Sequence, residues 1–134
     1  LNWIAYSILI LMKQLQNKRF YFYLGSSISW FFLIVYLLIF YKSVDVKSPT
    51  IYFDKIIHFL LFFIQSFLIT KTYFSVKFSF NFFKMILILL LIFCFLIEII
   101  QIIVPYRTFE YSDLLSNILG SALGSVFGYF LVSK

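Results

Sequence analysis

The sequence predicts an all-α integral membrane protein, a bundle of four transmembrane helices preceded by a short N-terminal interfacial helix. The chain has 134 residues, of which 63% are hydrophobic and only 12% charged, and its mean hydropathy is +1.04. A soluble domain has about 45–50% apolar and about 25% charged residues, so the composition excludes a water-soluble globular protein. Long uncharged runs approach the roughly 20 residues that a helix needs to cross a bilayer.

Residues 1–19 predict a helix that lies on the membrane surface. They begin with an apolar run of helical period that is too short to cross a bilayer, and Lys13, Lys18 and Arg19 follow it. An amphipathic interfacial helix fits this order better than a signal peptide, in which basic residues precede the apolar run. We therefore expect an interfacial segment over residues 1–19 and a four-helix membrane domain over residues 20–134.

Four apolar runs predict the transmembrane helices. The first and the last carry no charged residue, and the third is apolar except for Glu98 and Gln101. The second is short between Lys55 and Lys71, and we expect it to continue past Lys71, whose ammonium group can reach the membrane surface. The expected spans are about 20–41, 56–76, 85–104 and 114–132.

The basic residues predict how these spans are oriented. Cytoplasmic loops carry an excess of Lys and Arg, and the excess here falls on the side of the two termini. Both termini are therefore expected in the cytoplasm, with the loops 42–55 and 105–113 facing outward. The same placement accounts for the net charge of +6, so we expect no nucleic acid among the partners.

Three polar residues within the spans are expected at one depth beneath the outer loops. At about 1.5 Å per residue, His58, Glu98 and Asn117 lie within roughly 10 Å of the same end of the bundle. An ionisable side chain inside a span costs roughly 2.5–3.5 kcal/mol on insertion scales, and such residues generally serve a function. We expect the functional site in this layer.

His58, Glu98 and Asp54 are the candidate catalytic residues. A partly dry carboxyl such as Glu98 can act as a general acid or base. Asp54 lies one helical turn before His58, so its carboxylate can orient the imidazole. Packing roles are also open, because Glu98 can form a hydrogen-bonded clamp with Gln101 and Asn117. Asp54 can equally cap its helix, and His58 can bond a neighbouring helix.

Arg107 leads the candidate substrate-binding residues. Pro105 ends the third span, and a guanidinium held in the following turn can bind a carboxylate or phosphate through two hydrogen bonds. Arg107 can instead anchor the chain at the membrane interface or form a salt bridge to Glu110 or Asp113, and Asp113 can also be the N-cap of the fourth helix. The other candidates lie in the polar layer or at its rim: Lys55, Gln101, Asp113 and Asn117.

Gly120, Gly124 and Gly128 predict close helix packing. They form one bare stripe on the fourth span, which suits contact within the bundle or within a homo-oligomer. Cys94 is the single cysteine, and it lies in the middle of the third span, where we expect it to have a packing role.

We expect no metal ion and no cofactor. The sequence has no Cys/His metal spacing and no glycine-rich phosphate loop after a strand. Asp54, His58, Glu98 and Asp113 could chelate a divalent ion only if folding gathered them.

Four motifs follow one another from the second span to the fourth. They are Asp54-Lys55-x-x-His58-Phe59, Glu98-x-x-Gln101, Pro105-x-Arg107 and Asp113-x-x-x-Asn117-x-x-Gly120-x-x-x-Gly124. In this order and spacing the chain resembles the VanZ-like family of small multi-span bacterial membrane proteins. The resemblance covers about residues 50–128, and residues 1–12 lie outside it.

The resemblance implies a protein of the bacterial cytoplasmic membrane that acts at the cell envelope, in a family named for an accessory protein linked to low-level teicoplanin resistance. It names no reaction, so two classes of function stay open. An enzyme or modifier would bind the anionic group of a lipid-linked or cell-wall precursor through Arg107 and Lys55, while His58 and Glu98 moved protons. A non-enzymatic binder or scaffold would use the same layer to recognise an amphiphile or to pack helices. Membrane lipids are partners in either case.

Overall fold

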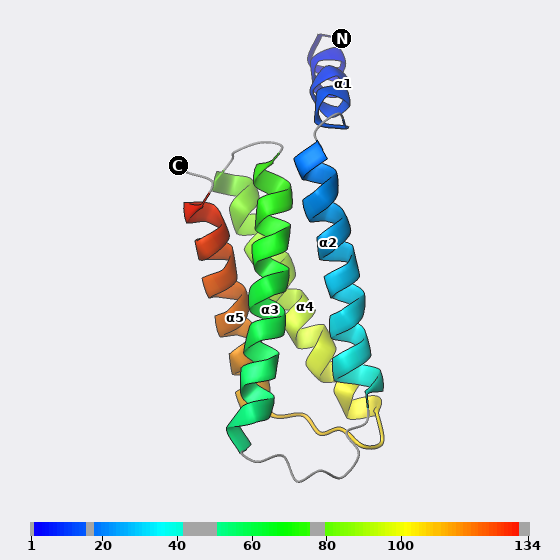
Figure 1. Ribbon diagram of the computed structural model, residues 1–134, viewed down its shortest axis with the longest axis vertical. Helices are drawn as coiled ribbons and strands as arrows, with labels where there is room; N and C mark the ends of the chain where they lie inside the picture. The colour runs from blue at the N-terminus through cyan, green and yellow to red at the C-terminus, as the bar shows by residue number, and fades with distance from the viewer. Residues whose placement is uncertain (1, 16–17, 42–50, 76–79, 132–134) are drawn as a thin grey trace.

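The computed structural model describes residues 2–15, 18–41, 51–75 and 80–131, and every regular element in these ranges is helical (Figure 1). The predicted all-α class is therefore confirmed. In chain order the elements are α1 (Asn2–Leu15), α2 (Lys18–Val35), the π-helical turn η1 (Tyr36–Phe40), α3 (Ile51–Phe74), α4 (Phe80–Ile103) and α5 (Tyr111–Phe130).

Helices α2 to α5 form an up-and-down bundle (Figure 1). α2 and α4 run in one direction and α3 and α5 in the other, and α3 packs against both α2 and α5. α1 and the last turn of α5 lie at one end of the bundle, which we call the terminal end. The α4–α5 connection, residues 104–110, lies at the opposite end, which we call the loop end.

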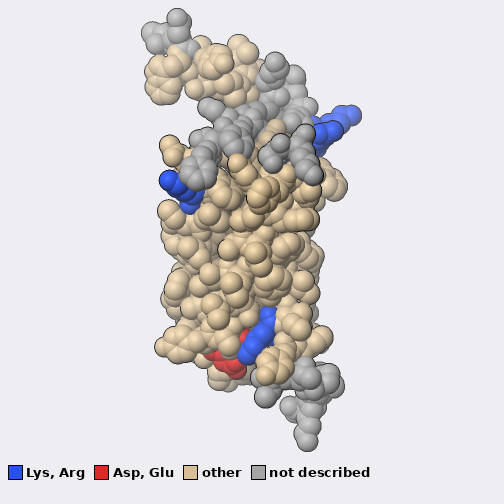
Figure 2. All heavy atoms as spheres, turned by 90° about the vertical axis from the view of Figure 1, so that its left-hand side faces the viewer, with Lys and Arg blue, Asp and Glu red and all other residues tan. Residues whose placement is uncertain are grey.

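Three helices are long and apolar enough to cross a membrane: Lys18–Phe40, Tyr52–Phe74 and Phe83–Ile103. On the face shown in Figure 2, the Lys, Arg, Asp and Glu side chains lie toward the two ends, and the band between them carries none. Such a band suits contact with lipid, where exposed charges are costly. The chain is therefore a membrane protein with three candidate spans.

Helix α5 is not among these candidates, so the predicted count of four spans is not confirmed. It has 20 residues, enough to cross a bilayer. Asp113, Asn117 and the glycines and serines that follow lower its hydropathy. Asp113, Asn117 and the glycines pack against α3, and Ser121 lies against Cys94 of α4. The opposite face exposes Leu115, Leu119 and Leu123.

The second span begins earlier than expected, because α3 starts at Ile51 and not near residue 56. Asp54 lies in the first turn of the helix and is not its N-cap, so the capping alternative for Asp54 is wrong. The charge of Lys55 does not end the helix, since its ammonium group is paired with two carboxylates at the start of the neighbouring helix α5.

The glycine stripe of α5 lies directly on α3. A Cβ atom on Gly120 would clash with the backbone carbonyl of Phe59, and a Cβ on Gly124 would clash with that of Phe63. Bare glycines let the two helix backbones approach this closely. The tight contact fixes the register of α5 on α3 and brings the polar residues of both helices together at the loop end.

Helix α1 extends beyond the bundle from the start of α2 (Figure 1). Its apolar side chains Trp3, Tyr6 and Leu9 are exposed. An interfacial position would cover these side chains with lipid, and the assignment of residues 1–19 to the membrane surface stays a prediction.

Candidate functional site

A chain of hydrogen bonds joins α3, α5 and α4 near the loop end. Nδ1 of His58 lies 3.0 Å from Oδ1 of Asn117, and Nδ2 of Asn117 lies 2.8 Å from Oε1 of Glu98. The side chains of His58 and Glu98 are 1% and 0% exposed, and Asn117 is fully buried as well. The predicted polar layer therefore exists, and it lies inside the bundle.

The direction of these bonds follows from the groups that can donate. The amide nitrogen of Asn117 can only donate, and it donates to Oε1 of Glu98, so the Asn117 carbonyl is left to accept. Nδ1–H of His58 then donates to that carbonyl. In the neutral imidazole this arrangement leaves a lone pair on Nε2, which lies 3.8 Å from Oδ2 of Asp113 and has no hydrogen-bond partner among the described residues.

Lys55 links the buried layer to the surface. Its Nζ lies 3.0 Å from Oδ1 of Asp113 and 2.9 Å from Oε2 of Glu110. Asp113 is 7% exposed and Glu110 49% exposed, so the polar groups run from solvent inward. The hydrogen bond from Lys55 holds the pKa of the Glu110 carboxyl below its usual range.

Six of the predicted site residues lie together, and we call them the polar cluster: Asp54, Lys55, His58, Glu98, Asp113 and Asn117. Within it, one ligand-type atom from each of Asp54, His58 and Asp113 lies within 4.8 Å of the other two. Their helical spacing explains the gathering. Asp54 and His58 are one turn apart on α3, and Asp113 and Asn117 are one turn apart on α5.

Gln101 and Arg107 lie apart from the polar cluster and bond η1 and Tyr41, which continue α2 and which we call the end of α2. Nε2 of Gln101 donates to the carbonyl of Leu38 at 2.9 Å. One guanidinium nitrogen of Arg107 donates to the carbonyls of Leu37 at 3.1 Å and Tyr41 at 3.0 Å. Both were predicted as substrate-binding residues. That role stays a prediction, and these donors already have partners in the structure.

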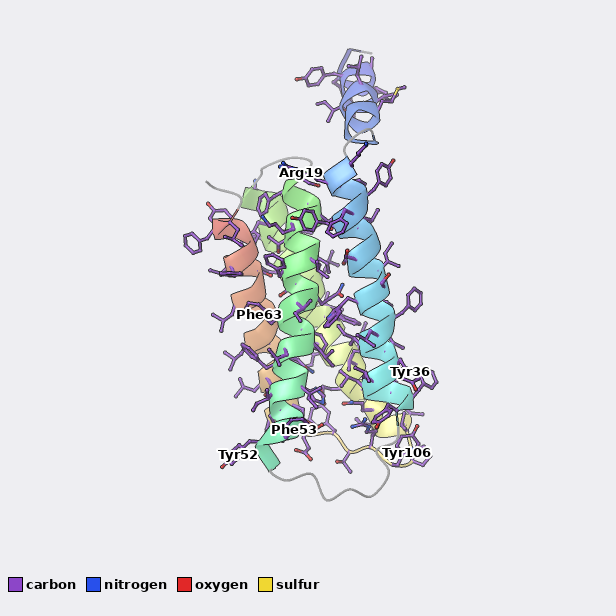
Figure 3. The ribbon with its side chains drawn as sticks, viewed as in Figure 1. Arg19, Tyr36, Tyr52, Phe53, Phe63 and Tyr106 are labelled. Atoms are coloured by element: carbon purple, nitrogen blue, oxygen red, sulfur yellow. The ribbon has the colours of Figure 1, made fainter. Side chains whose placement is uncertain are left out.

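Tyr106 completes this set of bonds to the end of α2. Its hydroxyl lies 3.3 Å from the carbonyls of both Ile39 and Phe40, and Figure 3 shows Tyr106 at the loop end. The last carbonyls of a helix lack partners within the helix, and in a membrane each unsatisfied one is costly. Gln101 of α4 and two loop residues, Tyr106 and Arg107, thus cap η1 and Tyr41, and Tyr106 was not among the residues selected from the sequence.

Several packing alternatives considered for these residues can be settled. Glu110 and Asp113 pair with Lys55, so they are not found bridged to Arg107. The N-cap of α5 is Glu110, and Asp113 lies inside the first turn, so the N-cap interpretation of Asp113 is wrong. The expected clamp is found between Asn117 and Glu98, without Gln101.

Other buried polar residues nearer the bundle centre were not singled out from the sequence. Nε2 of Gln65 donates to Oγ of Ser27 at 3.1 Å, and the indole nitrogen of Trp30 donates to the carbonyl of Leu61 at 2.9 Å. Both bonds join α2 to α3. Gln65 is an amide inside an apolar run, and the same signal selected Gln101. The sequence therefore allowed Gln65 to be predicted as a buried polar residue.

One of three comparisons with known proteins found a match. A model of the VanZ/LLP1 family matches residues 3–132, nearly the whole chain. The match extends well beyond residues 50–128 and takes in α1, which the resemblance had left outside. A search of curated proteins and a search of solved structures found no match.

Proposed function

We propose, since this chain belongs to the VanZ/LLP1 family, that it acts in the bacterial cytoplasmic membrane on a lipid-linked or surface molecule of the cell envelope. The observation that carries the proposal is the polar path at the loop end, which runs from half-exposed Glu110 through Lys55 and Asp113 to buried His58. A ligand held at the membrane surface would meet this path without leaving the lipid. Altered handling of such a molecule would change the susceptibility of the cell to teicoplanin.

The chemistry available to the cluster centres on Nε2 of His58. Asn117 and Glu98 hold the ring from the Nδ1 side, so Nε2 is the atom left to take a proton from a ligand. Because His58 is 1% exposed, neighbouring side chains must move aside before a reacting group can reach Nε2. The enzymatic form of the proposal gives His58 the base role and Glu98 the task of stabilising the charged imidazole.

A non-enzymatic binder or scaffold is the second candidate, and a specific observation favours it. Every hydrogen bond from His58 and Asn117 joins two helices, as expected of a packing element. In this form the cluster recognises an amphiphile or positions a partner, and proton transfer is irrelevant. Glu98→Gln and His58→Asn separate the two, because both keep a polar side chain of similar size and remove the proton-transfer group.

The test is teicoplanin susceptibility of a bacterial host that expresses the chain or a variant at equal membrane level. The enzymatic form expects both variants to lose any protection that the wild type confers. Full protection by both variants supports the binder. A wild-type chain that leaves the susceptibility unchanged contradicts the proposed envelope role for this antibiotic.

The proposed topology has four spans, with α5 as the fourth, both termini in the cytoplasm and the polar cluster facing outward. Supporting it, a cavity of about 510 Å³ at the terminal end is lined by Lys18, Arg19 and Lys71, as the positive-inside rule expects of a cytoplasmic end. The outer face of α5 exposes leucines that suit lipid.

Cysteine labelling of intact cells tests this topology. In a Cys94→Ser background, Thr108→Cys reports the loop end and Asn81→Cys the terminal end, since both positions are exposed. An impermeant thiol reagent should label Thr108→Cys alone. The opposite pattern would place the cluster in the cytoplasm and contradict an outward-facing site.

A further inference from the structure

We propose that Asp54, His58 and Asp113 form a binding site for a divalent transition-metal ion at the loop end. A ligand atom from each lies within 4.8 Å of the other two. Metal–ligand distances of about 2.0–2.2 Å put two ligands of one ion at most about 4.4 Å apart. Small side-chain rotations therefore bring all three onto an ion, and the packing of α5 on α3 holds their backbones in place.

The lone pair on Nε2 of His58 points to a cation independently of the carboxylates. This nitrogen has no hydrogen-bond partner among the described residues and belongs to a side chain that is 1% exposed. It faces Oδ2 of Asp113 at 3.8 Å, too long for a hydrogen bond through a proton on the nitrogen. Two electron-rich atoms that face each other in a buried site repel, and an ion bound between them satisfies both.

The groups behind the three ligands have the arrangement of a metal outer shell. A ligating histidine generally donates its second ring N–H to an acceptor, and His58 donates Nδ1–H to Asn117, which is itself anchored on Glu98. A ligating carboxylate is generally hydrogen-bonded as well, and Oδ1 of Asp113 accepts from Lys55 while Oδ2 faces His58. These bonds fix the tautomer and aim the lone pair before an ion arrives.

One imidazole and two carboxylates favour Zn²⁺ or Mn²⁺ over Ca²⁺ and Mg²⁺, which prefer oxygen ligands alone. Three protein ligands leave at least one position open for water or for an oxygen of a bound molecule. The rim carries the carboxylates of Asp54, Glu110 and Asp113 against the ammonium of Lys55, so it repels an anionic headgroup. A bound divalent ion reverses that charge and attracts the headgroup. Only this binding of a headgroup rests on the proposed function.

The experiment is calorimetric titration of the detergent-purified, chelator-stripped chain with Zn²⁺, and separately with Mn²⁺, using an affinity tag that contains no histidine. The wild type should bind one ion. Asp54→Asn should weaken binding about tenfold or more, since even outer-shell changes cost 10–100-fold. Ser116→Ala on α5 is the control, because the Ser116 hydroxyl donates to the carbonyl of Ser112 one turn back, and this variant should bind as the wild type does.

Wild-type chain that binds neither ion overturns the inference, as does equal binding by Asp54→Asn and the wild type. Circular dichroism of each variant excludes loss of fold as the cause of weaker binding. Zn²⁺ binding with unchanged teicoplanin susceptibility supports the metal site and contradicts the proposed function. Altered susceptibility without binding of Zn²⁺ or Mn²⁺ keeps the proposed function and overturns the metal site.

Discussion

His58, the single histidine of the chain, is held by Asn117 across the α3–α5 contact, with Nδ1 and Oδ1 3.0 Å apart. The sequence suggested that Asp54, one turn earlier on the same helix, would orient the ring. Asn117 takes that role because the glycine stripe lets α5 approach α3 closely enough for a short amide to reach the imidazole. Asp113 faces Nε2 of the ring at 3.8 Å, and a carboxylate oxygen of Asp54 lies within 4.8 Å of a ligand atom of both residues.

Asn117→Leu should destabilise the fold. A leucine of similar size leaves Nδ1–H of His58 and Oε1 of Glu98 buried without their partner, and each lost partner costs about 1–3 kcal/mol. Thermal unfolding in detergent, followed by circular dichroism, measures the change. Ser116→Ala is the control on the same helix, because the Ser116 hydroxyl bonds only the carbonyl of Ser112, one turn back. Equal melting temperatures for the two variants would contradict the role of Asn117.

Gly124→Ala should destabilise the α3–α5 contact by about 1–3 kcal/mol, the usual cost of overpacking. The added methyl group would clash with the backbone carbonyl of Phe63, so the helices must move apart. Gly25→Ala, on α2, is the matched control because its new Cβ would meet nothing within 4 Å. It should be neutral or stabilising, since alanine favours helices by about 1 kcal/mol over glycine. The melting temperature should therefore fall for Gly124→Ala and stay the same or rise for Gly25→Ala.

The depth of the polar residues could be predicted from the sequence, whereas their partners could not. The constant rise of a helix places His58, Glu98 and Asn117 in one layer once the span ends are roughly known. Which cation meets Glu110 and Asp113 depends on the path of the 104–110 loop. That loop turns Arg107 toward α2 and leaves the two carboxylates to Lys55.

The ends of the helices were predicted less well, for a related reason. Lys55 looked like the boundary of a span, because an unpaired charge is unfavourable in lipid. The ammonium group of Lys55 is paired with the carboxylates of Glu110 and Asp113 at the start of α5. This pairing removes the penalty, and α3 begins at Ile51. Likewise, the mean hydropathy of α5 is low because polar and small residues line its buried side. An average over the whole helix does not reveal that the opposite side is apolar.

Glu110→Gln should lower the stability of the fold slightly at neutral pH and not in acid. The pKa of Glu110 is lowered in the folded chain, so its charged form stabilises the fold above the ordinary glutamate pKa of about 4.3. That contribution is lost as the pH falls through the lowered folded value. Because Glu110 is 49% exposed, the difference at pH 7 should stay below about 1 kcal/mol. A melting-temperature gap between variant and wild type that persists below pH 3 would contradict the assignment.

Arg107→Met should loosen the end of α2 without disturbing the polar cluster. The guanidinium is bonded to the carbonyls of Leu37 and Tyr41, and methionine keeps most of the side-chain volume while removing both donors. Hydrogen exchange measured by mass spectrometry should rise in residues 35–41 and stay unchanged in α3 and α5. Tyr106→Phe is the graded control, because its hydroxyl makes longer bonds of 3.3 Å and should produce a smaller rise. If Arg107→Met abolished an activity with no change in exchange at residues 35–41, Arg107 would instead be a ligand-binding residue, as the motif first indicated.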